Sequence, residues 1–219
     1  MNNNYVDVWN ELHKEFSKKK IIKYDDWLDK YKDIVDNVND DIIDLGCGVT
    51  GNNTIFLLEK GKNVISCDFA YEALNVIDKI DGSKTLCFDM LEKFPFSDNY
   101  TSMIVADLSL HYFRKEDTIK ILKEISRVLK KDGYLFFRLN STNSTEYKNL
   151  IENNVEQIEE NLFFSKDMLK RFFCEDDIKF YFNDFDIISL REENMSRWTS
   201  DKIVWNGLVR KNNYINEQL

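Results

Sequence analysis

Short apolar runs alternate with amphipathic segments through the middle of the chain. Five such runs, each of five or six residues, lie at 41–45, 63–68, 84–89, 102–107 and 134–139. Runs of this length predict buried strands, and apolar residues at helical spacing between them predict crossover helices. Strands that alternate with helices form a parallel sheet that is covered on both faces. We therefore expect an α/β fold with a doubly wound, mostly parallel sheet.

The predicted helices are read from the same pattern. Apolar residues of 121–129 share one face, Gly133 follows the lysine-rich end, and this gives the clearest helix. Shorter helices are predicted at 54–59, which Gly61 would end, and at 73–80.

The two ends of the chain show other patterns. Residues 1–38 carry spaced aromatic residues, and 28–35 predict an amphipathic helix, so we expect an N-terminal helical cap. The polar stretch 141–164 fits a long loop or lid, followed by a helix around 168–173. The last two strand-like runs, 185–190 and 202–209, should pair antiparallel. The chain is thus expected to form one domain, with cap 1–38, core 39–140 and tail 141–219.

Composition narrows the class of protein. The 219 residues suit one α/β domain, and the absence of long apolar runs and of a signal-like N-terminus leads us to expect a cytoplasmic protein without a membrane partner. A net charge of −9 disfavours nucleic acid as a partner. The four cysteines show no metal-ligand spacing, so no metal is expected. The sequence gives no indication of the oligomeric state.

Four predicted strands end in acidic residues, namely Asp44, Asp68, Asp89 and Asp107. The carboxyl ends of parallel strands meet at one edge of a sheet, and ligands bind there beside the switch in strand order. Each aspartate alone also fits a turn or a helix cap. Four of them in register predict a binding crevice.

A glycine-rich turn follows the first strand. Gly46, Gly48 and Gly51 satisfy the G-x-G-x-x-G spacing of a dinucleotide site. The run Asp44-Leu45-Gly46-Cys47-Gly48 after an apolar strand resembles the first motif of class I S-adenosylmethionine-dependent methyltransferases. The resemblance covers about 39–140 by motifs and the remainder by architecture only. It implies a Rossmann-like, seven-stranded sheet with a terminal antiparallel strand.

The resemblance also implies cofactor contacts. Asp44 would lie near the ammonium group of S-adenosylmethionine, Asp68 would accept hydrogen bonds from the ribose hydroxyls, and Phe69 would pack on the adenine. Asp89 would read the adenine amino group. The full set of cofactor candidates is Asp44, Gly46, Cys47, Gly48, Gly51, Asn53, Asp68, Phe69, Asp89, Met90, Asp107 and Leu108.

The segment after the fourth strand resembles the part of the family that lines the transferring methyl group. His111 there is a candidate to take the acceptor's proton at neutral pH, or else to hydrogen-bond the backbone structurally. Candidates for contacts to the acceptor are Tyr24, Trp27, Tyr112, Arg138 and Asn140, with Arg197 and Trp198 between the last strands.

Two features depart from the family pattern. Gly51 comes three residues after Gly48 instead of two, which leaves the contacts of 49–53 open. Residues 107–110 lack the proline-aromatic motif of enzymes that methylate nucleobase or glutamine nitrogens, which disfavours that subclass.

The expected function is in-line transfer of a methyl group to a small-molecule acceptor, with S-adenosylhomocysteine as product. The alternatives are a non-catalytic S-adenosylmethionine-binding sensor or partner subunit, and an NAD-dependent oxidoreductase. The chain has no Tyr-x-x-x-Lys pair of the single-domain reductases, which weighs against the oxidoreductase.

Overall fold

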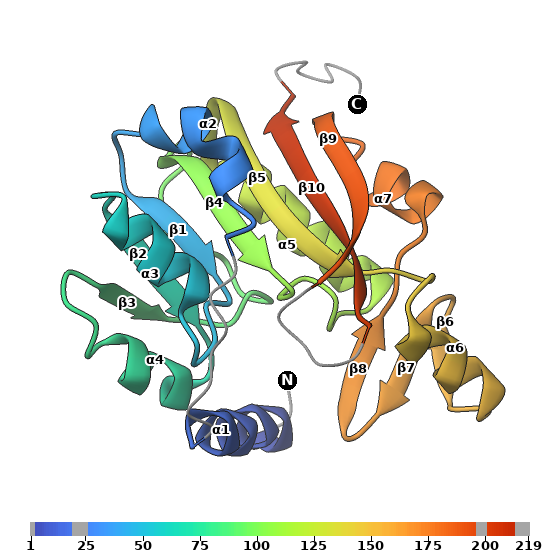
Figure 1. Ribbon diagram of the computed structural model, residues 1–219. Coiled ribbons are helices and arrows are strands. Elements are labelled where there is room, and N and C mark those ends of the chain that lie inside the picture. Colours follow the sequence, from blue (N-terminus) through green and yellow to red (C-terminus); the bar gives the residue numbers. More distant parts are fainter. Residues whose placement is uncertain (1–2, 19–25, 196–200, 213–219) are drawn as a thin grey trace.

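A computed structural model describes residues 3–18, 26–195 and 201–212 and shows a seven-stranded sheet with helices on both faces (Figure 1). In spatial order the strands are β3 (Lys84–Cys87), β2 (Val64–Asp68), β1 (Ile42–Leu45), β4 (Thr101–Asp107), β5 (Leu129–Asn140), β10 (Ile203–Lys211) and β9 (Phe185–Asn194). Only β10 runs antiparallel to its neighbours. The predicted fold class is confirmed.

Alternate residues of the central strands pack against different helices. Ile104 and Ala106 of β4 pack on α5 (Lys115–Val128) and α7 (Glu175–Tyr181), whereas Met103 and Val105 face α2 (Lys32–Asp36) and α3 (Asn52–Glu59). Both faces of the sheet are therefore buried, which explains why its strands read as continuous apolar runs. The order of the strands reverses between the neighbouring parallel strands β1 and β4.

The N-terminal part differs from the prediction in the placing of its helices. A long helix, α1 (Asn3–Ser17), lies across the carboxyl ends of the strands and contacts α4 (Tyr71–Ile77) (Figure 1). The helix expected over 28–35 is shorter, because a 3-10 turn (Asp29–Tyr31) precedes α2. None of the helices in the described ranges has both the length and the apolar character that a membrane span requires.

The tail corrects two expectations. Residues 141–164 do not form a long loop, since they contain α6 (Thr145–Glu152), β6 (Gln157–Glu159) and most of β7 (Leu162–Ser165). Residues 168–173 do not form a helix, because β8 (Met168–Arg171) pairs antiparallel with β7. Periodicity cannot separate strands from helices in apolar runs as short as four residues, and pairing with a partner decides between them. The antiparallel pairing of the last two strands is confirmed.

Candidate active site

A cavity of about 390 Å³ lies where the strand order reverses, at the carboxyl ends of β1, β2 and β4. Helix α1 covers it on one side, and the β7–β8 hairpin reaches toward it on the other (Figure 1). Its volume and its mainly apolar wall with a few polar groups are typical of a small-molecule site. The lining residues come from segments that lie far apart in the sequence.

The glycine-rich turn after β1 forms the floor of the cavity. Gly46 and Gly48 both adopt positive φ angles, +75° and +59°, and both line the cavity. A Cβ atom on Gly46 would lie 2.4 Å from the Cβ of Ser109, so the turn after β1 and the turn after β4 meet with no room for a side chain. This close approach leaves backbone, and not side chains, exposed to a ligand.

Gly51 serves a different purpose from the other two glycines. It has a φ of +51° and starts α3, and a Cβ atom there would meet the Cδ1 of Ile77 at 2.4 Å. It therefore lets α4 pack against the loop, and it is not among the residues that line the cavity. The neighbouring Thr50 and Asn52 do line the cavity, so the loop contacts that the sequence left open involve these residues and not Gly51.

Asp68 stands at the end of β2 and faces the cavity. Its carboxylate accepts hydrogen bonds from the backbone N–H groups of Gly48 at 3.0 Å and Ala70 at 2.9 Å. Burial raises the pKa of Asp68, and the nearby His13 opposes that shift. These bonds hold the carboxylate in one orientation, with lone pairs that remain able to accept hydrogen bonds from a ligand.

Asp44 lies behind the cavity wall and is fully buried. Its carboxylate accepts a 2.7 Å hydrogen bond from the hydroxyl of Thr54 and a 3.4 Å one from the amide of Asn53. Burial raises the pKa of Asp44 to about 6. Trp27 donates to the same Asn53 side chain at 2.9 Å. Asn53 does line the cavity, so Asp44 and Trp27 act on the site by fixing Asn53.

Asp107 ends β4 and forms a buried ion pair with Arg138 of β5. The guanidinium donates from Nε at 2.8 Å and from Nη2 at 2.6 Å, and the two side chains are 3% and 6% exposed for Arg138 and Asp107. The strand register sets Asp107 opposite Arg138, and the guanidinium also stacks 4.6 Å from the Trp27 ring. Asp107 lines the cavity, whereas Arg138 lies behind it.

Aromatic residues of α1 close the cavity on the side of β2. Tyr5 stacks on Phe69 with ring centroids 6.0 Å apart, and Trp9 meets Tyr112 edge-on at 4.8 Å. His13 is buried, and its Nδ1 has no hydrogen-bond partner among the described residues. Burial lowers the pKa of His13, while the charge of Asp68 acts in the opposite direction. A buried nitrogen without a partner inside a cavity indicates a place for a polar ligand atom.

The turn after β3 contributes two further predicted residues. Asp89 accepts a 2.9 Å hydrogen bond from the N–H of Leu91, and Met90 lies next to Gly46. Leu108, with a φ of +57°, follows Asp107 on the floor. All three line the cavity.

His111 and Tyr112 lie side by side with ring centroids 4.3 Å apart. Tyr112 lines the cavity, but His111 does not; it is 1% exposed, and neither ring nitrogen has a partner among the described residues. Burial lowers the pKa of His111 well below its usual value, and the charges of Lys202 and Lys170 add to this effect. Its imidazole is therefore neutral at pH 7.

The structure gathers most of the predicted site residues around one cavity. Those that line it are Gly46, Cys47, Gly48, Asn53, Asp68, Phe69, Asp89, Met90, Asp107, Leu108 and Tyr112. Those placed behind or beside it are Asp44, Gly51, Trp27, His111, Arg138 and Asn140. Tyr24, Arg197 and Trp198 lie outside the described residues.

Two groups of lining residues were not among the site candidates named from the sequence. The first comes from α1, and its signal was present, since Tyr5, Trp9, Leu12 and Phe16 recur at intervals of four, three and four. The second consists of Lys166, Met168 and Lys170 from the β7–β8 hairpin together with Lys202. No local sequence pattern marks these lysines, because only the tertiary fold brings them together.

A methyltransferase domain family matches residues 43–137, which run from within β1 to within β5 and include the floor of the cavity. The putative methyltransferase YqeM of Bacillus subtilis is 36% identical over 106 residues, which are 46% of this chain and 42% of YqeM. The chain thus spans less than half the length of this curated relative.

Two solved structures share the fold. A SAM-dependent methyltransferase from Anabaena variabilis has a TM-score of 0.71 at 17% identity, with 96% of each chain covered. A 1,6-didemethyltoxoflavin-N1-methyltransferase from Burkholderia thailandensis, solved with its substrate and S-adenosylhomocysteine, has a TM-score of 0.65 at 16% identity, with 97% of this chain and 91% of that one covered. The domain match and the relative show that residues 43–137 are similar to methyltransferase domains, and the solved structures show that the chain shares their fold.

Proposed function

We propose that this protein binds S-adenosylmethionine in the cavity beneath α1 and transfers its methyl group to a small-molecule acceptor. One observation carries the proposal: the glycine turn, Asp68 and the end of β4 converge on a single cavity at the switch in strand order. The toxoflavin enzyme, which shares the fold, has a small-molecule substrate and supports the choice of acceptor class.

The residues present fit the cofactor. Gly46 and Gly48 let the backbone approach a ligand where a Cβ atom would collide, and Asp68 offers a fixed carboxylate to the ribose hydroxyls. The unpartnered Nδ1 of His13 offers a further polar contact beside Asp68. We assign Phe69 and the Asp89–Met90 turn to the adenine, and Asp107 with Leu108 to the end that carries the methyl group.

When bound, S-adenosylmethionine supplies a methyl group that its sulfonium has already activated, so the protein needs no obligatory general base. Helix α1 excludes water by packing Trp9 against Tyr112 and Tyr5 against Phe69. Tyr112 positions the acceptor at the cavity wall. His111 is neutral and buried behind that wall, and we assign it the positioning of Tyr112, against which its ring packs.

Binding of the product analogue tests the first half of the proposal. S-adenosylhomocysteine should raise the melting temperature by mass action, by an amount that grows with its concentration, and NAD should not. Asp68→Asn should weaken this response, while Asp33→Asn on the exposed surface of α2 should retain it. A melting temperature that S-adenosylhomocysteine leaves unchanged would refute the proposed site.

Transfer tests the second half. Incubation with methyl-labelled S-adenosylmethionine and a metabolite extract should give a labelled small molecule. Binding of S-adenosylhomocysteine without transfer to any extract would identify the protein as a non-catalytic binder instead. His111→Gln should lower kcat and leave the kcat against pH profile unchanged near neutrality. Loss of the acidic limb, in which kcat of the parent protein falls as His111 becomes protonated, would show instead that His111 takes the proton.

A further inference from the structure

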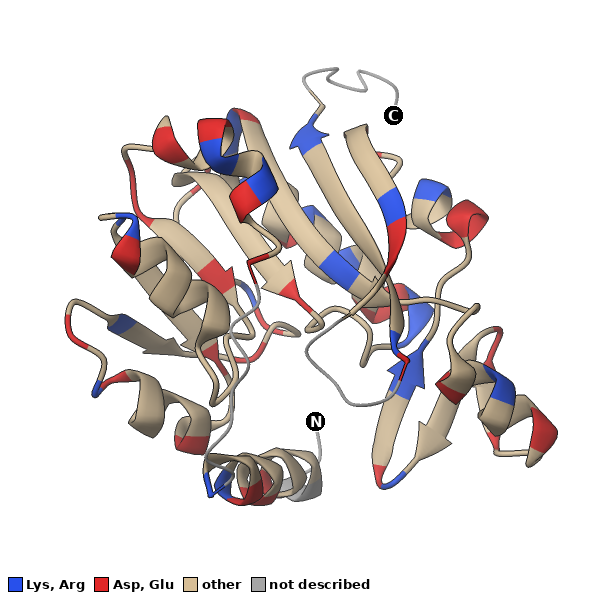
Figure 2. Ribbon diagram, viewed as in Figure 1, with Lys and Arg blue, Asp and Glu red and all other residues tan. Residues whose placement is uncertain are grey.

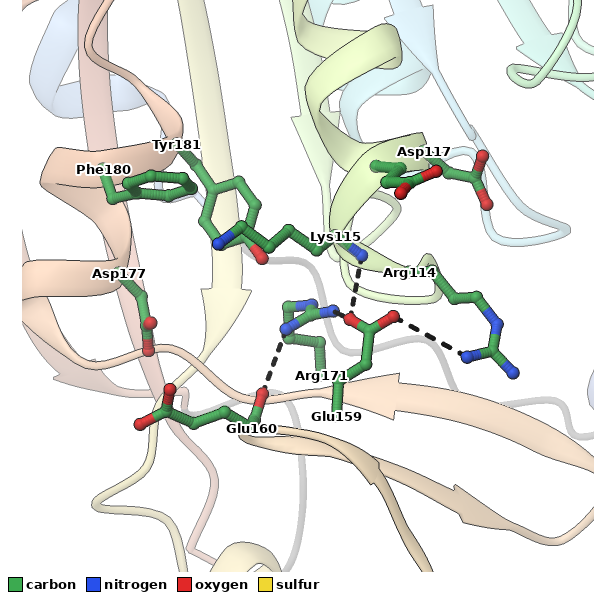
Figure 3. Close-up of a pocket in the computed structure, with 10 residues that line it drawn as sticks. Arg114, Lys115, Asp117, Glu159, Glu160, Arg171, Asp177, Phe180 and Tyr181 are labelled. Atoms are coloured by element: carbon green, nitrogen blue, oxygen red, sulfur yellow. Dashed lines mark hydrogen bonds and ion pairs between the residues drawn. The ribbon is translucent and has the colours of Figure 1, made fainter.

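Two cavities of the molecule differ in whether their buried polar groups have partners. The second cavity, of about 680 Å³, lies between α5, α7 and the β6–β7 turn (Figure 3). Its buried guanidinium, Arg171 of β8, pairs with Glu159 and donates to the backbone oxygen of Glu160 at 3.1 Å. Glu159 also pairs with Arg114 at 3.7 Å. None of the described residues that line this cavity has a buried polar side-chain atom without a partner.

The cavity beneath α1 contains a buried group that lacks a partner. His13 lines this cavity and is 7% exposed, and its Nδ1 makes no hydrogen bond in the described part of the chain. Its Cε1 lies 3.7 Å from the position that a Cβ atom of Gly48 would take, so the imidazole lies over the glycine-rich turn. Because buried polar atoms are nearly always hydrogen-bonded, Nδ1 indicates the place of a ligand atom.

The docking of α1 sets the position of His13. The side chain of Asn10 accepts a hydrogen bond from the backbone N–H of Glu72 of α4 at 3.2 Å, and Lys14 pairs with Glu72 at 3.7 Å. The ring of His13 also packs against Trp9, one turn earlier in α1, with ring centroids 5.6 Å apart. These contacts hold the imidazole over the glycine-rich turn.

The order of the strands indicates which part of S-adenosylmethionine would meet His13. The turn Asp89–Met90, which we assign to the adenine, follows β3, and Asp68, which we assign to the ribose, ends β2. Strand β1 is the next neighbour in the sheet, and the glycine-rich turn follows it. The amino-acid part of the cofactor would therefore extend from the ribose along this turn, under His13.

That amino-acid part ends in a carboxylate, which needs a hydrogen-bond donor once it leaves water. The strand ends beneath α1 are acidic, as Figure 2 shows for β1 and β4. Among the lining residues that the structure describes, the other groups able to carry a positive charge belong to the β7–β8 hairpin and to the segment before β10, not to the side of β1 and β2. Helix α3, which begins at Asn52 beside the cavity, presents its N-terminus to the same end, and a helix N-terminus favours negative charge.

We propose that His13 binds the carboxylate of the amino-acid part of S-adenosylmethionine, and that it does so as an imidazolium that takes up a proton from solvent when the cofactor binds. This inference deepens the proposed function and rests on it. It assigns recognition of the amino-acid part to α1, which lies outside the matched residues 43–137.

The charge of His13 determines how binding depends on pH. Burial lowers the pKa of His13, and the charge of Asp68 acts in the opposite direction, so the free imidazole is neutral at pH 7. A bound carboxylate stabilises the protonated imidazole. Binding should therefore weaken as the pH rises from about 6 to about 8, where the proton becomes harder to take up.

Other titratable groups near His13 are accounted for by the comparison of variants. Glu72 of α4 is paired with Lys14, and burial raises the pKa of Cys47 in the glycine-rich turn, which keeps it a neutral thiol. Burial also raises the pKa of Asp44, behind the cavity wall, to about 6. Titration of Asp44 remains when His13 is replaced, so the difference between the parent protein and a His13 variant isolates His13.

Calorimetric titration of the full chain with two ligands tests the assignment. S-adenosylhomocysteine has the amino-acid part, whereas 5′-methylthioadenosine has the adenine, ribose and thioether without it. His13→Phe, which keeps a ring against Trp9, should raise the Kd for S-adenosylhomocysteine by about tenfold or more, the usual cost of losing a hydrogen bond to a charged group. It should leave the Kd for 5′-methylthioadenosine unchanged. Glu11→Gln on the exposed side of α1 should change neither Kd.

Proton uptake provides a second measurement. Heats of binding in buffers of different ionisation enthalpy should show that the parent protein takes up protons with S-adenosylhomocysteine and not with 5′-methylthioadenosine. His13→Asn keeps an uncharged donor near the position of Nδ1, so it should lose this uptake and the pH dependence that His13 adds, while retaining more affinity than His13→Phe.

The outcomes separate this inference from the proposed function. Equal losses of affinity for both ligands in His13→Phe, or an unchanged affinity for S-adenosylhomocysteine, would overturn the role of His13. If 5′-methylthioadenosine binds too weakly to measure, proton uptake and its loss in His13→Asn decide, and uptake that persists in that variant would overturn the role. A parent protein that binds neither ligand would count against the proposed function instead.

Discussion

Replacing Gly46 by alanine tests whether close contact between two turns shapes the floor of the cofactor cavity. The substitution adds one methyl group at a φ of +75°, where it meets the Cβ of Ser109 at 2.4 Å and the Cε of Met90 at 3.1 Å. Ser109 cannot move aside easily, because its hydroxyl donates a 2.7 Å hydrogen bond to the backbone oxygen of Leu45. The two turns must therefore separate.

Gly61 provides the matched control. Its φ of +71° carries the same conformational strain, but no atom of the described residues lies within 4 Å of a Cβ atom placed there. The left-handed conformation costs an alanine about 1–2 kcal/mol, and overpacking adds about 1–3 kcal/mol. Gly61→Ala should thus lower the free energy of unfolding by about 1–2 kcal/mol, and Gly46→Ala by about 2–5 kcal/mol.

Urea unfolding measures the two stabilities, and calorimetric titration measures the affinity for S-adenosylhomocysteine. Gly46→Ala should raise the Kd by about tenfold or more, the equivalent of 1.4 kcal/mol, and Gly61→Ala should leave it unchanged. If both variants lose the same stability and bind equally well, the contact between Gly46 and Ser109 does not shape the cavity and the reasoning is wrong.

Two further predictions concern buried charges. Because the pKa of Asp44 is raised to about 6, the folded protein keeps a proton that the unfolded chain loses, and stability should fall by about 3 kcal/mol as the pH rises from about 4 to 7. Asp44→Asn should abolish this fall in urea unfolding at the two pH values, and a parallel decline in both proteins would contradict it. Arg138→Met should lower the free energy of unfolding by about 3–5 kcal/mol, because it leaves Asp107 buried without its guanidinium partner. Arg138→Met/Asp107→Asn should recover part of that loss. If the losses of the two single variants add instead, the pair is not coupled.

The sheet and the floor of the cavity could be predicted from the sequence, because burial on both faces of the sheet gives its strands a recognisable apolar pattern. The runs that became β1, β2 and β4 are mostly apolar, and the spacing of Ile121, Leu122 and Ile125 marks α5. The glycines and aspartates at strand ends then followed from the rule that ligands bind at that edge.

The rest depended on contacts that no local pattern encodes. The aromatic face of α1 covers a cavity and not the core, so it reads as scattered aromatics among charges. The pairing of Asp107 with Arg138 follows from strand register. Asp107 faces the cavity, and Arg138 supports Asp107 from behind the cavity wall. The role of Gly51 likewise depends on where Ile77 of α4 packs.

In the β7–β8 hairpin, consecutive residues of β8 have different roles, because their side chains point to opposite faces of the strand. Arg171 anchors the hairpin to the rest of the molecule, while Lys170 and Met168 line the cavity in which we propose that the acceptor binds. Selection can therefore vary the residues that choose the acceptor without touching the anchor or the cofactor floor. Relatives that keep the arginine but exchange the residues at 166, 168 and 170 should share the cofactor and differ in the acceptor. Substitutions in this hairpin can therefore change the substrate preference with little effect on the stability of the fold.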